Sequence, residues 1–336
     1  MSFNDPFDDC FDQCGPTVLF LLGNGFDLFH GMATSYSDFE NYLDSKNSGF
    51  ASALISHLDP CLKPDWSNFE DSIGNLDVGS LQEMAFEAVQ KSDTDDDYDS
   101  GTSDGMDEWL KDELDYIHSL PEELRGWVES IPPAKKKMFS NLNLPFAKFF
   151  TFNYTDTLER IYGIPDSQIW HIHGRASNAD EPLLIGSFNS DRIAKAESQL
   201  DLIPELDIKM QTCWESFLNY YQETEKDVDA NISNNAFQFK DLNSVSLLII
   251  IGFSFGRVDL PYLRKIGENA LKIQKVVITY HVDEKNKDWG NQSALWKNQI
   301  ETILQDNNIR FCSIDFLKTE ELPSKLRGYL KDYGSF

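Results

Sequence analysis

Long apolar runs are missing from this sequence of 336 residues. No run approaches the ~18 residues that a membrane-spanning helix needs, and the longest, residues 245–253, has the length of a strand. The first ten residues are acidic and lack the basic segment with which a secretory signal begins. We therefore expect a soluble, cytoplasmic protein with no membrane partner.

Cysteine is scarce and irregularly placed. Of the five cysteines only Cys10 and Cys14 lie close together, and no second pair completes a zinc ribbon. This usage is typical of a reducing compartment, where disulfides are rare. We expect neither a disulfide framework nor a bound metal.

Positive charge is also scarce, since the formal net charge is −27 and the pI is about 4.4. Such a surface repels phosphate backbones, which argues against a nucleic acid partner. The stretch from Asp93 to Asp115 holds eleven acidic residues and one lysine. Asp93, Asp95 and Asp97 imitate the start of a calcium loop, but Tyr98 stands where the sharp turn needs glycine. We interpret the stretch as a solvated insertion.

Short apolar runs are the main structural signal that the sequence does contain. Four of them stop abruptly at small or polar residues: 18–22, 149–152, 169–172 and 245–251. Continuous runs of this kind are typical of strands buried on both faces, as in a parallel sheet. Two further strands are expected at 275–280 and 309–314.

Helical patterns separate the expected strands. Residues 37–40 have the spacing of a capping box, 155–162 form a helical stretch before Gly163, and 291–304 have helical periodicity. Asp259 precedes Leu260 and Pro261 as a helix cap would. The alternation predicts an α/β fold: a doubly wound, mainly parallel, Rossmann-like sheet in one domain over residues 1–336.

Two stretches do not fit this alternation. Residues ~50–145 are helical and acidic, and residues ~190–240 are polar with Met210, Trp214, Phe217 and Leu218 at helical spacing. We interpret both as helical insertions on the α/β core.

Polar and small residues follow the strands where ligands bind in open α/β sheets, outside the carboxyl ends. If the strands are parallel neighbours, these residues meet in one crevice. They are Gly23, Asn24, Gly25, Phe26 and Asp27 after the first strand, Asn153 and Asp156 after the second, His171 and His173 at the third, and Gly252, Ser254 and Asp259 after the fourth.

Each of these residues also has a purely structural interpretation. Gly23 and Gly25 suit either a tight turn or exposed N–H groups that bind pyrophosphate. Asp27 either caps the following segment or holds a ribose hydroxyl, and Asn153 either caps a helix or positions a water. Asp156 and Asp259 have helix capping as their alternative.

The two histidines alternate on an expected strand, so their side chains should point to one face. His171 is then a residue of the crevice wall, and His173, next to Gly174, reaches the crevice. An imidazole there can act as a general base near neutral pH. A shared metal site is the other option, but the spacing offers no third or fourth ligand.

Several segments together resemble the AbiH family, a bacterial group associated with abortive infection by phage. They are residues 21–27 (LLGNGFD), 34–39 (TSYSDF), 66–70 (WSNFE), 152–159 (FNYTDTLE), 171–174 (HIHG) and 251–259 (IGFSFGRVD). The resemblance spans residues 18–280 in order.

More distantly, the same segments resemble sirtuin-like NAD-binding domains of bacterial antiphage NADases. The resemblance implies NAD contacts at Gly23, Gly25, Gly252 and Ser254, and hydrolysis carried by an asparagine and a histidine, here Asn153 and His173. This chain departs from the pattern in three places. Asp27 replaces a serine, Thr155 stands where an acid is expected with Asp156 shifted by one, and the zinc ribbon of deacylases is absent.

Four functions remain open from the sequence. The first is an NAD glycohydrolase that depletes NAD during infection, in which Asp27 or Asp156 stabilises the transition state. The second is a sensor that binds NAD or another nucleotide without turnover. The third is an interaction module in a complex with a defence partner protein, with the acidic insertion as its docking surface. The fourth is a nuclease, which the negative charge opposes. A glycohydrolase implies regulation by a homo-oligomer, a lid or a phage trigger.

Overall fold

The computed structural model describes residues 17–46, 49–58, 69–92, 103–140, 142–281 and 289–333, and the chain divides into two compact units. Within that part of the chain, unit 1 draws on Met1–Thr34, Ile131–Glu181 and Asp227–Phe336, and unit 2 on Ser35–Ser130 and Pro182–Lys226. The two stretches predicted as separate insertions thus contribute most of one unit. The predicted residues Cys10, Cys14, Cys61, Trp66, Asp93, Asp95 and Asp97 lie outside the described residues.

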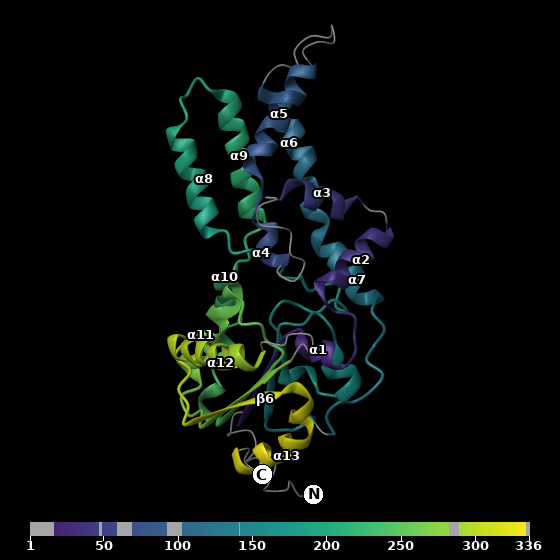
Figure 1. The fold of residues 1–336 in the computed structure, drawn as a ribbon, viewed down its shortest axis with the longest axis vertical. Coiled ribbons are helices and arrows are strands. Elements are labelled where there is room, and N and C mark those ends of the chain that lie inside the picture. The colour runs from purple at the N-terminus through teal and green to yellow at the C-terminus, as the bar shows by residue number, and fades with distance from the viewer. Residues whose placement is uncertain are drawn as a thin grey trace, which may run out of the picture. The chain divides into compact units, whose positions relative to one another are not determined.

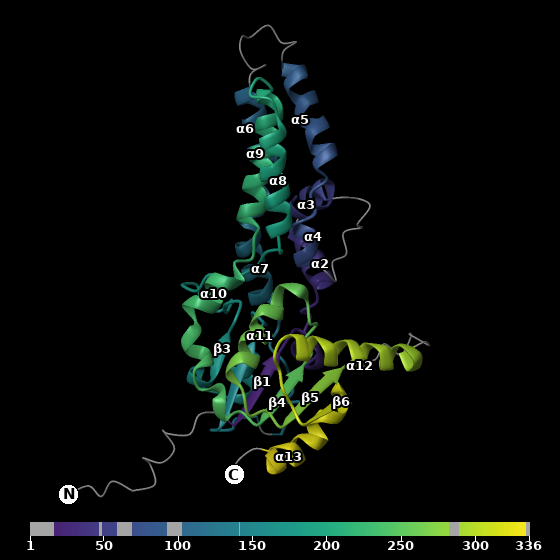
Figure 2. The ribbon, with the colours of Figure 1, turned by 90° about the vertical axis from the view of Figure 1, so that its left-hand side faces the viewer.

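Unit 1 is built on a six-stranded sheet, with the order β3-β2-β1-β4-β5-β6 and parallel pairing throughout (Figure 2). The strands are β1 (Val18–Leu22), β2 (Ala147–Thr151), β3 (Ile169–His171), β4 (Leu247–Ile251), β5 (Lys275–Tyr280) and β6 (Ser313–Lys318). The predicted α/β fold with a doubly wound parallel sheet is confirmed.

Both faces of the central strands are covered, which explains why their sequences are apolar without alternation. Every residue of β1 and β4 is buried. On one face, Phe20 stacks on Phe149 at 4.8 Å in a cluster that includes α13 (Leu322–Tyr333). On the other face, Phe150 contacts Phe239 and Trp170, and Trp170 contacts Tyr262 of α11 (Leu260–Asn269).

The connections of unit 1 are mostly short helices (Figure 1). Besides α11 and α13 they are α1 (Gly25–Phe29), the π-helix η5 (Leu158–Tyr162), η6 (Asp166–Gln168), α10 (Val228–Asn234), η7 (Ala236–Phe239), η8 (Leu242–Ser244), η9 (Arg257–Asp259), α12 (Trp289–Asp306) and η10 (Thr319–Glu321). The stop at Gly163 is confirmed, because this residue caps η5 with φ 68°. The strand predicted at 309–314 is wrong by four residues, since the buried Ile309 lies in the turn before β6.

The described residues of unit 2 form helices: α2 (Tyr36–Lys46), α3 (Phe50–His57), α4 (Phe69–Ile73), α5 (Val78–Ser92), α6 (Ser103–Leu114), η4 (Asp115–Ser119), α7 (Leu120–Ser130), α8 (Ser190–Leu202) and α9 (Ile208–Glu223). Helix α9 packs against α8 and α6 (Figure 1). The helical spacing predicted from Met210 onward is confirmed, with Phe217 fully buried.

The capping box predicted at residues 37–40 is wrong by two residues. The backbone N–H of Ser35 donates to Asp38 Oδ2 at 3.0 Å, and the N–H of Asp38 donates to Ser35 Oγ at 3.2 Å. Helix α2 therefore begins at Tyr36, where these reciprocal bonds satisfy its first donors.

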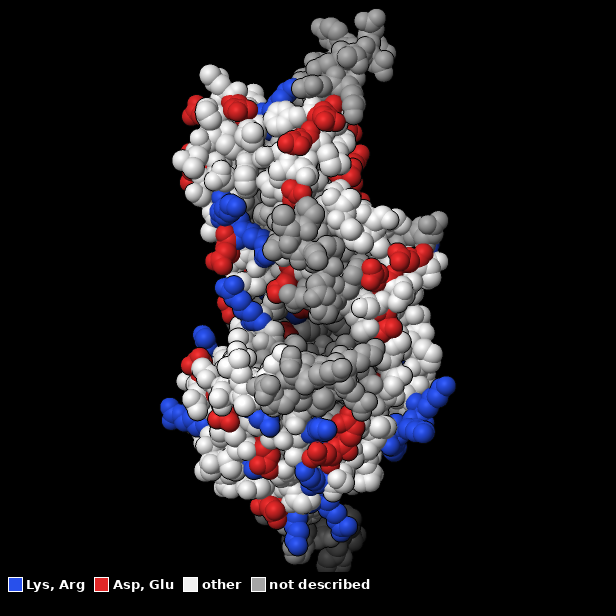
Figure 3. Space-filling model, in the orientation of Figure 1, with Lys and Arg blue, Asp and Glu red and all other residues white. Residues whose placement is uncertain are grey.

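Two surface properties bear on partners. None of the helices among the described residues is both long and apolar enough to cross a membrane. Acidic and basic side chains are interspersed over the face shown in Figure 3.

Candidate functional site

The carboxyl ends of β1, β2 and β4 lie side by side. Leu22 pairs with Thr151 on one side and Ile251 on the other. The pairing continues beyond the strands, since the N–H of Gly23 donates to Ile251 O at 3.0 Å and that of Phe152 to Leu22 O at 2.9 Å. The polar segments after these strands therefore meet at one edge of the sheet, as the sequence predicted.

The glycines at this edge allow two loops to touch. A Cβ on Gly25 would lie 2.5 Å from the Cα of Gly252, and Gly252 itself has φ 61°. The N–H of Gly25 donates to Gly252 O at 3.0 Å. The prediction that the N–H groups of Gly23 and Gly25 are exposed for a phosphate is therefore wrong, because both bond to carbonyls at the end of β4.

Asp27 lies at the centre of the site and is 1% exposed. Its Oδ2 accepts a hydrogen bond from Thr155 Oγ1 at 2.6 Å, and its Oδ1 has no hydrogen-bond partner among the described residues. Burial raises the pKa of Asp27 to about 6, against the opposing effects of the Thr155 and Thr157 hydroxyls, the positive charge of His171 and the Asn153 amide. An acid with this pKa can exchange a proton near neutral pH.

Two neighbours of Asp27 have other roles. Phe26 packs in the core against Phe139 and Tyr162. Asn24 is exposed, and its Nδ2 donates to Thr34 O at 2.6 Å. Of these two predicted ligand contacts, only Asn24 presents its side chain at the surface.

Asn153 follows β2 and is buried, with 7% exposure. Its N–H donates to Thr151 Oγ1 at 3.1 Å, and its carbonyl lies 3.2 Å from His171 Nδ1. A hydrogen bond from the side-chain amide of Asn153 lowers the pKa of Asp27 and so partly opposes the effect of burial. The structure thus brings Asn153, Asp27 and His171 together.

The two histidines do not share a face, so that prediction is wrong. Strand β3 ends at His171, and the turn that follows sends His173 elsewhere. His171 pairs with Glu159, whereas Nε2 of the buried His173 lies 3.2 Å from Oδ1 of Asp259. The rings of Phe152, Tyr154 and Tyr262 surround His173 at 5.1, 5.9 and 6.2 Å.

Asp259 does not cap helix α11 with its side chain, which rules out that alternative. It faces His173 instead and can orient the imidazole and stabilise its protonated form. The loop before it exposes Ser254 and holds Phe255 at φ 58°, a conformation that bulky side chains rarely adopt. Such strain is found disproportionately at functional sites.

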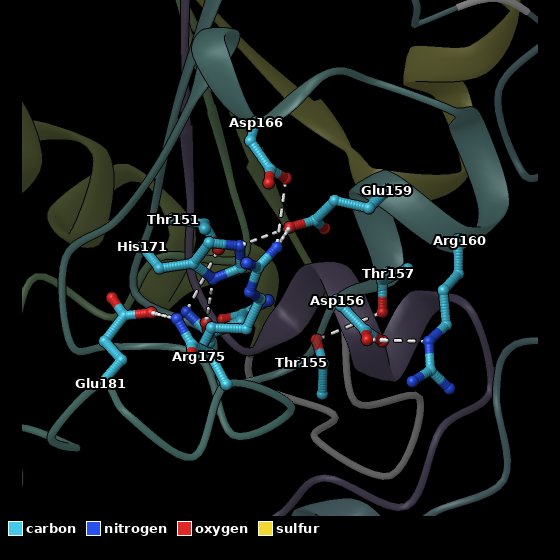
Figure 4. A network of polar contacts seen from close by, with 12 residues as sticks. Thr151, Thr155, Asp156, Thr157, Glu159, Arg160, Asp166, His171, Arg175 and Glu181 are labelled. Carbon is cyan, nitrogen blue, oxygen red and sulfur yellow. Dashed lines mark hydrogen bonds and ion pairs between the residues drawn. The ribbon is translucent and has the colours of Figure 1, made fainter.

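Asp156 points away from this group. Its Oδ2 pairs with Arg160 Nε at 2.7 Å, one turn along the chain, as Figure 4 shows. Its neighbours Thr155 and Thr157 turn inward, with their hydroxyls 3.2 Å apart. Of the two candidate carboxylates, Asp27 rather than Asp156 lies with Asn153.

Four residues of the site were missed from the sequence: Thr155, Thr157, Glu159 and Arg175. Thr155 and Thr157 lie in the bend and the first helical turn after β2, where a spacing of two residues gives no signal that both hydroxyls turn inward. Glu159 and Arg175 carried no signal either, because they meet only through the fold, around His171 (Figure 4).

Metal binding has no support in the described part of the chain. Nowhere in it do three His, Cys, Asp or Glu side chains gather in a way that could hold a metal ion. Among the described residues the buried Oδ1 of Asp27 has no hydrogen-bond partner, which leaves a polar atom of the site for an organic ligand.

Comparison with known proteins gives one match. The family described as bacteriophage abortive infection AbiH matches residues 19–281, which include every predicted site residue. No curated protein and no solved structure matches the chain. Because the match covers well over half of the sequence, the chain belongs to the AbiH family of bacteriophage abortive infection proteins.

Proposed function

We propose that this AbiH protein hydrolyses NAD to nicotinamide and ADP-ribose, and so depletes NAD in the infected cell. The observation that carries the proposal is the carboxylate of Asp27, buried at the edge where β1 and β2 end, with Oδ1 unpartnered among the described residues. A buried carboxylate is a strong local negative charge that a cationic centre can neutralise.

NAD hydrolysis needs a negative charge more than a general acid. The bond between C1′ of the ribose and the nicotinamide nitrogen breaks with both electrons moving to the ring, so a cationic group departs neutral. The ribose becomes oxocarbenium-like, as in glycoside hydrolysis. We assign Asp27 to the stabilisation of that positive charge.

Water completes the reaction at C1′. His173 accepts the proton that the attacking water loses, and Asp259, 3.2 Å from its Nε2, stabilises the imidazolium. Asn153 orients the water or a ribose hydroxyl with its amide. The exposed side chains of Asn24 and Ser254, on the two loops that meet at Gly25 and Gly252, are assigned to the pyrophosphate.

Infected cells test the proposal. The NAD content should fall after phage addition in cells carrying the wild type, and it should stay constant with Asn153→Ala or His173→Ala. Asp156→Ala is the matched control, because its carboxylate pairs with Arg160, and it should behave as the wild type. Phage protection without any fall in NAD would contradict the proposal.

Binding without turnover is the second candidate, and one observation favours it. Asp27, Asn153 and His173 are all at least nine-tenths buried, so they are shielded from bulk water. A sensor would bind NAD with the same affinity in the wild type and in Asp27→Asn, and it would release no nicotinamide.

A further inference from the structure

We propose that Glu159 and His171 form a positioning dyad that fixes the backbone of Asn153 in the site of Asp27. This inference rests on the proposed function, because it assigns the two residues to the same site. Neither of them contacts the substrate in that assignment, and the sequence gave Glu159 no role of its own.

Glu159 is held in place by an imidazole and a guanidinium. Its Oε1 accepts from His171 Nε2 at 2.8 Å and from Arg175 Nη1 at 3.0 Å, and Arg175 also reaches Asp166 Oδ1 at 3.1 Å (Figure 4). Burial alone would raise the pKa of Glu159, but the bond to His171, its charge and the bond to Arg175 outweigh it, so the pKa lies below its usual value. Glu159 is therefore a carboxylate near neutral pH.

Glu159 stands on the π-helix η5 (Leu158–Tyr162). The π-helix is rare and occurs frequently at functional sites, where the wider turn redirects a side chain. Here the side chain turns toward β3 and meets His171. The π-helix therefore places the carboxylate of Glu159 against the imidazole of His171, as expected of a positioning residue.

His171 links Glu159 to the backbone of Asn153. Both ring nitrogens face oxygen acceptors, Nε2 the carboxylate of Glu159 and Nδ1 the carbonyl of Asn153 at 3.2 Å. The two contacts fix the plane of the imidazole between the carboxylate of Glu159 and the peptide of Asn153.

The dyad acts on Asn153 and Asp27. The N–H of Asn153 is fixed by Thr151 Oγ1 and its carbonyl by His171, so the peptide is held on both sides. The charge of His171 favours the ionised form of Asp27. The charged groups that face His171 are Asp27 from α1, Glu159 from η5 and Arg175 from the segment after β3.

The test follows the titration of Asp27 directly, in protein labelled with ¹³C at the aspartate carboxyl. The Asp27 signal is identified by its loss in Asp27→Asn. Because the charge of His171 lowers the pKa of Asp27, the midpoint should rise by about one unit in His171→Gln. In Glu159→Gln the midpoint should shift as well, because the imidazole loses the carboxylate that fixes its position. Asp166→Asn is the matched control, since its exposed carboxylate belongs to the same chain of ion pairs but does not touch His171.

Turnover provides the second measurement. In both dyad variants kcat for NAD should fall with KM nearly unchanged. The low-pH side of the plot of kcat against pH should also shift, whereas a merely structural role would leave it in place. The titration needs no substrate, so a shift in its midpoint supports the dyad even if NAD is not cleaved. An unchanged Asp27 midpoint in either folded variant would overturn the dyad, and the two variants guard against misfolding of one.

Discussion

Thr155 Oγ1 donates a hydrogen bond of 2.6 Å to Oδ2 of Asp27, joining the segment after β2 to the helix after β1. This bond ties the buried carboxylate of Asp27 to the segment that follows β2.

Asp27→Asn should abolish NAD cleavage and stabilise the protein. Burial raises the pKa of Asp27 in the folded state from 3.8 to about 6. The contribution of this carboxyl group to the free energy of unfolding is therefore fully present below pH 3.8 and is lost as the pH rises through about 6. Above that pH the buried charge costs about 3 kcal/mol, a cost that the neutral amide avoids. Thermal unfolding at pH 7.5 should therefore give a higher Tm for the variant.

The same comparison at low pH is the check on this explanation. Around pH 4 Asp27 is protonated in the folded state, so the advantage of Asp27→Asn should disappear there. Asp156→Asn, which alters a surface pair with Arg160, should change Tm little at either pH. A variant that is less stable than the wild type at pH 7.5 would show that the charge of Asp27 holds the fold together.

Gly252→Ala should destabilise unit 1 more than Gly256→Ala. A Cβ at 252 would overlap the backbone of Gly25, and the residue has φ 61°, so the loops would have to separate and the backbone would be strained. We expect a loss of about 2–4 kcal/mol. At Gly256 the nearest atom to an added Cβ is Ser254 Oγ at 3.5 Å, so Gly256→Ala should be nearly neutral in urea unfolding. Equal losses would contradict the assigned loop contact.

His30 makes stability depend on pH in the opposite direction to Asp27. Burial lowers its pKa below 6.5, and its ring bonds to Phe26 O and Tyr162 Oη suit the neutral form. The folded state therefore binds this proton less tightly than the unfolded state, and stability is lost as the pH falls below 6.5. Between pH 7.5 and 5.5, His30→Gln should lose less stability than the wild type, as measured by urea unfolding; identical slopes would refute the role of His30.

Within unit 2, Lys226→Met should be strongly destabilising. The Lys226 ammonium is fully buried and lies 2.8 Å from Glu70 Oε2, while Tyr36 donates to Glu70 Oε1 at 2.9 Å. Removing one partner of a buried pair leaves a poorly solvated charge, at a cost of about 3 kcal/mol. The double variant with Glu70→Gln should recover part of that loss, and purely additive losses in a double-mutant cycle would contradict a direct coupling.

The fold was largely predictable because the apolar runs that form its strands can be recognised from neighbouring residues in the sequence. The runs that form β1 and β4 are apolar throughout, which is typical of strands covered on both faces. The strand at β6 was misplaced because Ile309 is buried in a turn, and burial of a single residue does not distinguish a turn from a strand.

The site was predictable in place but not in detail. The positions of Asn153 and Asp27 follow from where their strands end, which sequence reveals. The partner of each side chain depends on the paths of turns: the turn after β3 separates His173 from His171, and the π-helix aims Glu159. The backbone N–H groups of Gly23 and Gly25 were assigned to a ligand because their bonds to β4 involve residues more than 200 positions away.

Nicotinamide release from NAD by the purified protein, followed by chromatography with and without extract of phage-infected cells, tests the central claim most directly. The account predicts release by the wild type and by Asp156→Ala, and none by His173→Ala or Asp27→Asn. Absence of release by the wild type in both conditions, or undiminished release by His173→Ala and Asp27→Asn, would contradict it.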